Sequence, residues 1–310
     1  MNLVFCGTPQ FAVPTLQQLL AAGQTIQLVV TQPDRVRGRD DHPSPPPVKI
    51  LAAESGVPVV QPEKIKNNPE FRARLESLEP DAIIVVAYGR IIPEWMLSLP
   101  RFGNINLHAS LLPKYRGAAP IQWAIANGET VTGATTMRLD PGLDTGDILL
   151  QRTLPIDPDQ TSEDLFPLLA STGAALMLET LQGLEAGTIQ PTAQNHAAAS
   201  LAPILQREDA LVNFALAASE IYNRWRGFQP WPGAYTFFRG RKLILHRLRP
   251  AGSGSGKTGE MTVQGTRMFV TAGSATILEL LEVQLEGKKR MPVADFLRGT
   301  VPHPHERLGE

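Results

Sequence analysis

The first 31 residues, Met1 to Thr31, read MNLVFCGTPQFAVPTLQQLLAAGQTIQLVVT, and they indicate the class of fold. Val4–Cys6 is a short apolar run typical of a buried strand, and Ile26–Thr31 is a second one. Between them, apolar side chains recur at helical spacing up to Gly23, a residue type that commonly follows a helix end. Two strands joined by a helix predict a parallel pair with a right-handed crossover. The chain therefore begins as an α/β domain.

The same alternation of helices and strands continues through the first 189 residues. Residues 81–87 contain the uninterrupted apolar run AIIVVA, which is expected of a strand covered on both faces. We predict a doubly wound parallel sheet domain over residues 1–189. Its further helices are expected at Val48–Ser55, Glu70–Leu78 and Leu165–Leu184, and its further strands at Asn104–Leu107, Gly133–Leu139 and Ile148–Thr153.

A second domain is expected after a linker at residues 190–206, where the sequence is rich in Thr, Gln, Asn, Ala and Pro and has no clear periodicity. Beyond it, short apolar runs alternate with glycine-rich turns. This pattern predicts a small antiparallel barrel or sandwich over residues 207–310. A length of 310 residues suits two domains of roughly 150 residues each.

The composition excludes several classes of protein. With 43% hydrophobic and 19% charged residues, the chain resembles a soluble globular protein. Cys6 is the one cysteine, so there is no internal disulfide framework. Met1 leads directly into a strand-like segment, and we expect no signal peptide, no membrane span and a cytoplasmic location. The six histidines lack the spacing of a metal site, so we expect no metal.

The charge is distributed unevenly along the chain. Residues 1–205 carry 14 basic and 20 acidic side chains, whereas residues 206–310 carry 15 basic and 10 acidic ones. A basic module favours a polyanionic partner, because neutralisation of phosphates by Lys and Arg drives association with nucleic acids. An ordinary solvated basic surface explains the charge equally well.

Two glycine-containing stretches resemble nucleotide-binding loops. Gly7-Thr8-Pro9 follows a strand, but the G-x-G-x-x-G fingerprint is incomplete, which argues against a nicotinamide site. Ala251–Thr258, AGSGSGKT, matches a relaxed phosphate-loop pattern. Such a loop should lead into a helix, yet a strand-like segment follows. We interpret it as a connection between strands.

The strongest chemical signal lies in residues 103–112, GNINLHASLL. On a strand, Asn106 and His108 are two residues apart and project to the same face. Open α/β sheets bind ligands at the carboxyl ends of their strands, where this pair is expected. Hydrogen-bonded structure would also account for the pair. A third element, LDPGLDTGD at Leu139–Asp147, adds a tight loop with three aspartates and favours a functional site.

The combination of N-x-H-x-S-L-L-P, Y-R-G-A-A-P-I and D-x-G-L-D-T-G-D resembles the folate-dependent formyltransferases. Nearly the whole chain resembles this family, including FxGTPxFA at Phe5–Ala12 and EGKKRMPVADFL at Glu286–Leu297. The resemblance implies a Rossmann-like domain followed by an oligonucleotide-binding (OB-like) barrel that binds tRNA. It also implies transfer of a formyl group from 10-formyltetrahydrofolate to an amine, with the methionine of charged initiator tRNA as the expected acceptor. Separately, we expect a monomer, although nothing in the sequence indicates the oligomeric state.

The resemblance further implies the roles of individual residues. The family's catalytic triad corresponds to Asn106, His108 and Asp144. Asn106 would donate to the developing oxyanion, which is worth about 3–4 kcal/mol in other enzymes. His108 would stabilise the same charge or move the amine proton, and Asp144 would orient it. Contacts to folate are implied for Ser110, Leu111, Leu112 and Pro113, and for Tyr88, Gly89, Arg90, Ile91 and Ile92.

One loop departs from the family pattern. After Arg35 the family usually carries further lysines that are thought to reach toward the tRNA, but here Asp40 and Asp41 stand in the segment Arg35–Asp41. A solvated surface loop is the alternative. Two other functions remain open from the sequence: a formyltransferase for an amino-sugar nucleotide or a ribonucleotide amine, and a folate- or RNA-binding module without catalysis.

Overall fold

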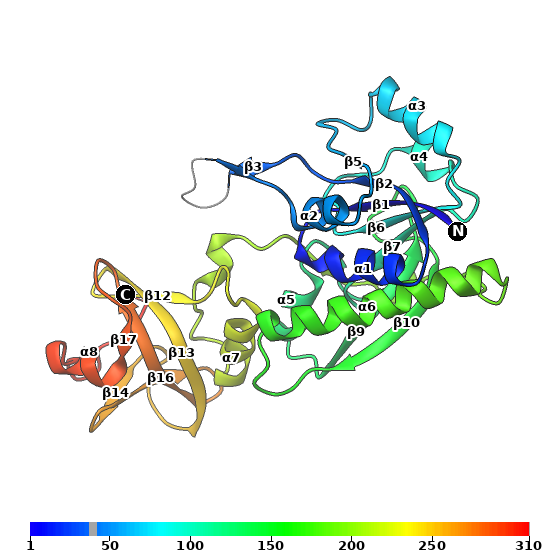
Figure 1. The fold of residues 1–310 in the computed structure, drawn as a ribbon. Coiled ribbons are helices and arrows are strands. Elements are labelled where there is room, and N and C mark those ends of the chain that lie inside the picture. Colours follow the sequence, from blue (N-terminus) through cyan, green and yellow to red (C-terminus); the bar gives the residue numbers. More distant parts are fainter. Residues whose placement is uncertain (37–41, 310) are drawn as a thin grey trace. The chain divides into compact units, whose positions relative to one another are not determined.

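The computed structural model describes residues 1–36 and 42–309, which form two compact units (Figure 1). The first unit comprises residues 1–120, 131–155 and 165–202, and the second comprises 121–130, 156–164 and 203–310. The segment expected to be a linker, 190–206, is divided at Ala202, so that 190–202 belong to the first unit. Two short segments that we expected in the N-terminal domain belong to the second unit.

The first unit is built on a seven-stranded sheet. Five of its strands are parallel, as expected, but β9 runs antiparallel to both of its neighbours. Parallel neighbours need a crossover that returns the chain to the other end of the sheet. The connection from β7 to β9 instead passes through residues 121–130 of the second unit and re-enters the sheet where β7 ends. In spatial order the strands are β10 (Ile148–Pro155), β9 (Val131–Arg138), β7 (Asn104–His108), β6 (Ala82–Val86), β1 (Asn2–Gly7), β2 (Thr25–Val30) and β5 (Val59–Val60).

Helices cover both faces of this sheet (Figure 1). On one face α6 packs directly on β7 and β9, where Thr180 hydrogen-bonds Thr136. On the other face Phe71 and Met96, from α3 and α4, join the side chains of β1 and β6 in a buried cluster. α6 is long and apolar enough to span a membrane, but half of its apolar stretch is buried, as in a core helix. The helices are α1 (Val13–Ala21), α2 (Pro47–Glu54), α3 (Pro69–Leu78), α4 (Glu94–Leu97) and α6 (Ser162–Glu185).

Local sequence signals explain where these helices begin and end. α3 starts at Pro69, whose missing N–H costs nothing in the first turn. Before it, the side chain of Asn68 accepts the N–H of Phe71 at 3.0 Å and caps the helix. After α1, Gly23 adopts a φ of 73°, a left-handed conformation that glycine reaches without steric cost.

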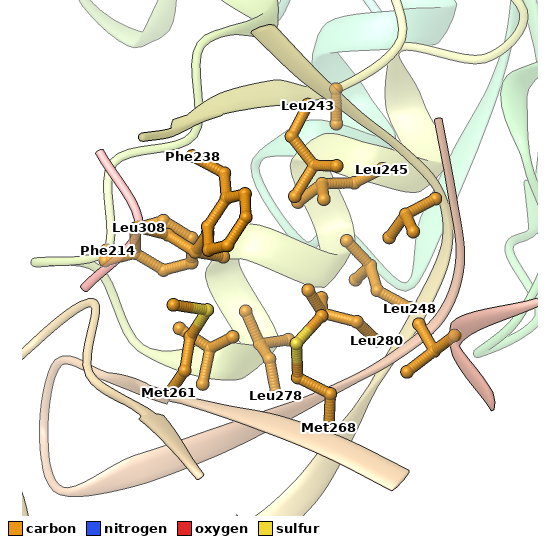
Figure 2. Packing of buried hydrophobic residues seen from close by; sticks show 14 of the residues in the cluster. Phe214, Phe238, Leu243, Leu245, Leu248, Met261, Met268, Leu278, Leu280 and Leu308 are labelled. Carbon is orange, nitrogen blue, oxygen red and sulfur yellow. The ribbon is translucent and has the colours of Figure 1, made fainter. Parts of the chain in front are cut away.

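The second unit is an antiparallel β domain with its own core. Its inward-facing side chains come from every long strand and from α7 and α8, and Figure 2 shows Phe238, Leu245 and Leu280 converging in its centre. Such burial is the main stabilising contribution of a small β domain. The elements are α7 (Ala218–Gly227), β12 (Tyr235–Phe238), β13 (Arg241–Ser253), β14 (Met261–Gln264), β15 (Arg267–Ala272), β16 (Thr276–Leu285), β17 (Met291–Pro292) and α8 (Val293–Gly299).

The C-terminal residues join the two edge strands of this sheet. The N–H of Met261 in β14 donates to the carbonyl of Glu306, and the N–H of Gly309 donates to the carbonyl of Phe237 in β12. Leu308, between them, is buried in the core. The tail therefore closes the sheet into a barrel and satisfies edges that would otherwise be open.

The AGSGSGKT stretch, Ala251–Thr258, forms the end of β13 and most of the connection to β14. β13 ends at Ser253, and the chain continues through residues 254–260 into a strand, not into a helix. Lys257 is exposed, and its backbone N–H donates to the carboxylate of Glu260. The interpretation as a connection between strands is confirmed.

The second unit also holds two segments that interrupt the first. α5 (Pro120–Ala126) packs closely on α7, because Gly227 leaves no room for a side chain against the carbonyl of Gln122. Trp123 stacks edge-on against Phe228 at 5.4 Å. The segment 156–164 is fixed by the buried guanidinium of Arg226, which donates to the carbonyls of residues 157 and 160.

Candidate active site

Asn106 and His108 lie on β7 and face the same side of the sheet. Their antiparallel partners on β9 are Met137 and Thr135. α6 covers the opposite face of these strands, since a side chain at Gly173 would collide with Leu107. On the face of Asn106 and His108, loops after β7 and β9 take the place of a helix. Among the described residues, the carboxamide of Asn106 has no hydrogen-bond partner and is free to bind a ligand.

His108 is almost fully buried, and both ring nitrogens face polar groups. Nε2 lies 2.9 Å from the carbonyl oxygen of Tyr115. Because a carbonyl can only accept, Nε2 carries a proton in this arrangement. Nδ1 lies 3.5 Å from Oδ2 of Asp144. The ring is thereby held in one orientation between the two loops.

Asp144 reaches His108 from a strained loop. Its φ of 52° lies in the left-handed region, which costs most residues other than Gly, Asn and Asp about 1–2 kcal/mol. Oδ2 accepts the backbone N–H of Gly117 at 2.8 Å. The loop passes close to β9, because a side chain at Gly146 would meet the carbonyl oxygen of Arg138 at 1.9 Å. Gly146 of the LDPGLDTGD motif is therefore a steric requirement of the site.

The expected folate segment Ser110–Pro113 follows β7 directly and is fixed by two side chains of the neighbouring strands. Thr135 donates to the carbonyl of Ser110 at 2.6 Å and accepts the N–H of Leu112 at 3.2 Å. Gln151 of β10 donates to the carbonyl of Leu112 at 2.9 Å. The peptide bond between Leu112 and Pro113 is cis, and the side chain of Ser110 is fully buried.

The second expected folate segment, Tyr88–Ile92, follows β6. Val85 pairs with Asn106, so this segment leaves the sheet at the same edge as Ser110–Pro113. The Tyr88 ring points into the core, where burial raises the pKa of its hydroxyl, and its backbone carbonyl accepts from the side chain of Gln32 at 2.9 Å. Gly89 has a φ of 75°, the side chain of Arg90 donates to the carbonyl of Glu63, and Ile92 packs on the core. Ile91 is 91% exposed.

Several residues that hold the site together were not singled out from the sequence. Thr135 and Gln151 read as ordinary strand residues, and no sequence signal marks them. Arg116 lies inside the Y-R-G motif, so the sequence contained a signal that could have identified it as part of the site. Gln194 lies in the aperiodic segment that we expected to be a linker, yet it is buried against the loop of Asp144.

Part of the expected nucleic-acid loop lies outside the described residues. Of Arg35–Asp41, only Arg35 and Val36 are described, and both are exposed on the short strand β3 (Arg35–Val36), which pairs with β4 (Pro43–Ser44). Within residues 1–36 and 42–309, no three His, Cys, Asp or Glu side chains are arranged to hold a metal ion.

Comparison with known proteins gives consistent matches along the chain. The formyl transferase family matches residues 1–181, and the C-terminal domain of formyl transferases matches residues 204–301. Two relatives named methionyl-tRNA formyltransferase, from Acidobacterium capsulatum and Koribacter versatilis, are 65% and 59% identical to this chain. The alignments cover all of this chain, and 100% and 99% of the two relatives.

Solved structures share the fold at lower identity. An N-formyltransferase from Helicobacter canadensis in complex with folinic acid and dTDP-3-aminofucose superposes with a TM-score of 0.63 at 20% identity, covering 90% of this chain and 98% of that one. HypX from Aquifex aeolicus in complex with tetrahydrofolic acid gives a TM-score of 0.58 at 18% identity, covering 96% of this chain and 47% of that one. On the strength of the two family matches and the full-length relatives, this chain belongs to the formyl transferase family.

Proposed function

We propose that this protein transfers the formyl group of 10-formyltetrahydrofolate to the amino group of methionyl-initiator tRNA. The observation that carries the proposal is the arrangement at the end of β7, where the unpartnered carboxamide of Asn106 lies on the same face as a His108 ring aligned by Asp144. Formyl transfer needs a donor for the developing oxyanion and an oriented group that handles a proton. Family membership and full-length relatives of that name support the same reaction.

In this proposal the three side chains have separate roles. Asn106 donates its amide hydrogens to the oxyanion that forms when the amine attacks the formyl carbon. His108 stabilises the same charge, and its orientation is kept by the Tyr115 carbonyl and by Asp144. Because Nε2 is already engaged, the proton of the amine leaves through Nδ1 or through water. Asp144 aligns the ring from the Nδ1 side and balances positive charge on it.

We assign folate binding to the two loops that leave the sheet beside Asn106. Ser110–Pro113 offers a backbone held rigidly by Thr135 and Gln151, which suits a pre-formed site. In Tyr88–Ile92 the side chain of Gln32 holds the backbone by donating to the carbonyls of Tyr88 and Gly89, and the exposed side chain of Ile91 is available to cover an aromatic ring. The unpartnered Asn106 at the centre is consistent with a donor bound between these loops.

We assign tRNA binding to the second unit, and we propose that the protein acts in the cytoplasm as a monomer. We expect six cations of this unit to contribute, and their contacts differ: Arg239, Arg241, Lys242, Lys288, Lys289 and Arg290. Arg239 and Arg290 form ion pairs with Glu306 and Glu282. Arg241 donates to the carbonyl of residue 286, and Lys242 lies 3.9 Å from the centre of the Tyr235 ring. Lys288 and Lys289 are exposed in the turn between β16 and β17.

The test is to incubate the protein with 10-formyltetrahydrofolate and one acceptor at a time, and to measure release of tetrahydrofolate. The acceptors are methionyl-initiator tRNA, uncharged initiator tRNA, an amino-sugar nucleotide and glycinamide ribonucleotide. We expect release with methionyl-initiator tRNA alone, because uncharged tRNA lacks the amine. Release with a small amine and none with charged tRNA would overturn the proposal.

A further inference from the structure

The loop that carries Asp144 is held by a buried pair of side chains, Arg116 and Gln194. The amide nitrogen of Gln194 donates to the carbonyl oxygens of Asp144 at 2.9 Å and of Gly146 at 2.7 Å. Its amide oxygen accepts from Nε and Nη2 of Arg116 at 3.2 and 2.6 Å. Both side chains are at least nine-tenths buried.

The hydrogen bonds of Gln194 fix its orientation. An amide group has two N–H donors and one oxygen with two lone pairs, and all four are used. A guanidinium can only donate and a carbonyl can only accept, so the amide cannot be reversed without losing every bond. Arg116 is in turn attached through Nη2 to Nδ1 of His196 at 3.1 Å. The pair is therefore a rigid support for the carbonyls at 144 and 146.

The position of Asp144 depends on this support. The side chain of Asp140 bonds within the loop, to the N–H of Gly142 and the hydroxyl of Thr145. These bonds shape the loop but do not attach it to the site. The carboxylate of Asp144 accepts from the backbone N–H of Gly117, which follows Arg116 directly. Arg116 and Gln194 thus connect the backbone of residue 144 to the same short strand, β8 (Arg116–Gly117), that binds its carboxylate.

We propose that Arg116 and Gln194 are positioning residues, which set Asp144 against His108 and act on the reaction only through Asp144. The inference rests on the proposed function, because it assigns Asp144 a role in formyl transfer. Neither side chain contacts the reacting groups. Their loss should therefore lower kcat and leave the KM for 10-formyltetrahydrofolate nearly unchanged.

Gln194→Glu separates positioning from packing. A glutamate keeps the bond to Arg116, now as an ion pair, but cannot donate to the two carbonyls and repels them. We expect kcat to fall by about 10²-fold, as misplacement of a catalytic group by about 1 Å can cause. The matched control is Gln27→Glu, since Gln27 also donates to a backbone carbonyl, that of Leu78, at the opposite end of β2 from the ligand edge. We expect its kcat to stay within about twofold of wild type, a change near the typical error of such comparisons.

A double-variant cycle tests whether the effect passes through Asp144. In the Asp144→Ala background, Gln194→Glu should cause no further loss of kcat. If Gln194→Glu fails to fold, Arg116→Lys takes its place in the cycle. Lysine keeps the positive charge but cannot make the bidentate bond to Gln194, so we expect a smaller loss of kcat with the same dependence on Asp144. Multiplicative losses, or near-normal kcat in both single variants, would overturn the inference. The kcat of each variant is compared with that of wild type, measured with the same acceptor. If the wild type itself showed no formyl transfer, the proposed function would be rejected and not this inference.

Discussion

The carboxylate of Asp144 accepts a hydrogen bond at 2.8 Å from the backbone N–H of Gly117. Two residues earlier, the carbonyl of Tyr115 lies 2.9 Å from Nε2 of His108. One short stretch of backbone therefore positions both members of the His–Asp pair. Their relative geometry is set by the main chain after β7 and not only by their own 3.5 Å contact.

Asp144→Asn and Asp144→Ala should lower turnover to similar extents but differ in stability. Asparagine tolerates the left-handed backbone at residue 144, whereas alanine does not, and it retains an oxygen for the Gly117 N–H. We expect kcat to fall about a hundredfold or more in both variants. Unfolding in denaturant should show Asp144→Ala to be less stable than Asp144→Asn by about 1–2 kcal/mol. Equal stabilities would show that the backbone at this position is not strained.

Asn106→Ala and His108→Ala should each reduce kcat by about a hundredfold or more, through loss of an oxyanion donor or of a proton-handling group. The two variants should differ in stability. Asn106 loses no hydrogen bond on truncation, so its melting temperature should remain near wild type. His108→Ala leaves a buried cavity and removes the hydrogen bond to the Tyr115 carbonyl, and should unfold earlier. Near-normal turnover of either variant with charged tRNA would remove that residue from the catalytic set.

The sequence predicted most elements of the fold because the apolar pattern decides them locally. β1, β6 and α6 lie close to their expected bounds, and the barrel strands were found between their turns. The direction of β9 was not predictable, because it depends on where the chain goes after Pro120, and α5 packs on α7 over a hundred residues later in the chain. The role of the C-terminal tail in closing the barrel was also missed. Leu308 lies in a segment without periodicity, and its contacts are with strands far away in the sequence.

The site was predictable only where its residues share a strand or a motif. Asn106 and His108 were placed together by the two-residue spacing of a strand. Gln194 was missed, because its partners at residues 144 and 146 are backbone carbonyls, which leave no mark in a sequence. Tyr88 was expected among the folate contacts, and the structure places its ring in the core, where the apolar faces of β1 and β6 meet.

Glu279 should make the second unit sensitive to acid. It lies on the outer face of β16, and Arg267 and Arg249 hold the pKa of its carboxyl at about 2, below its ordinary value of 4.5. Since the folded-state pKa is the lower one, the stabilisation is complete above pH 4.5 and is lost as the pH falls toward 2. The difference in unfolding free energy between wild type and Glu279→Gln should shrink over that range. If this difference in unfolding free energy did not change with pH, the ion pairs of Glu279 would be contradicted. Glu185→Gln, at the exposed end of α6, is the control.

Leu308→Ala should destabilise the second unit by about 2–5 kcal/mol, the usual cost of truncating a buried leucine. Leu308 is 3% exposed and packs in the barrel core, although only two residues follow it in the sequence. Val301→Ala is the matched control, because Val301 is 72% exposed in the same tail. Chemical denaturation of both full-length variants measures the difference. If the two variants were equally stable, the tail would not close the barrel.

Lys288 and Lys289 should contribute more to tRNA binding than Arg239 and Arg290, although removing either pair changes the net charge equally. The arginines are already engaged by Glu306 and Glu282, whereas the lysines stand exposed in one turn. Each phosphate contact adds about 0.7–0.9 to the slope of log K against log salt. The double variant Lys288→Ala/Lys289→Ala should therefore lose about 1.4–1.8 from this slope for methionyl-initiator tRNA. Arg239→Ala/Arg290→Ala should weaken binding through net charge with a smaller change in slope. A slope unchanged from wild type in Lys288→Ala/Lys289→Ala would mean that the turn between β16 and β17 makes no direct phosphate contact.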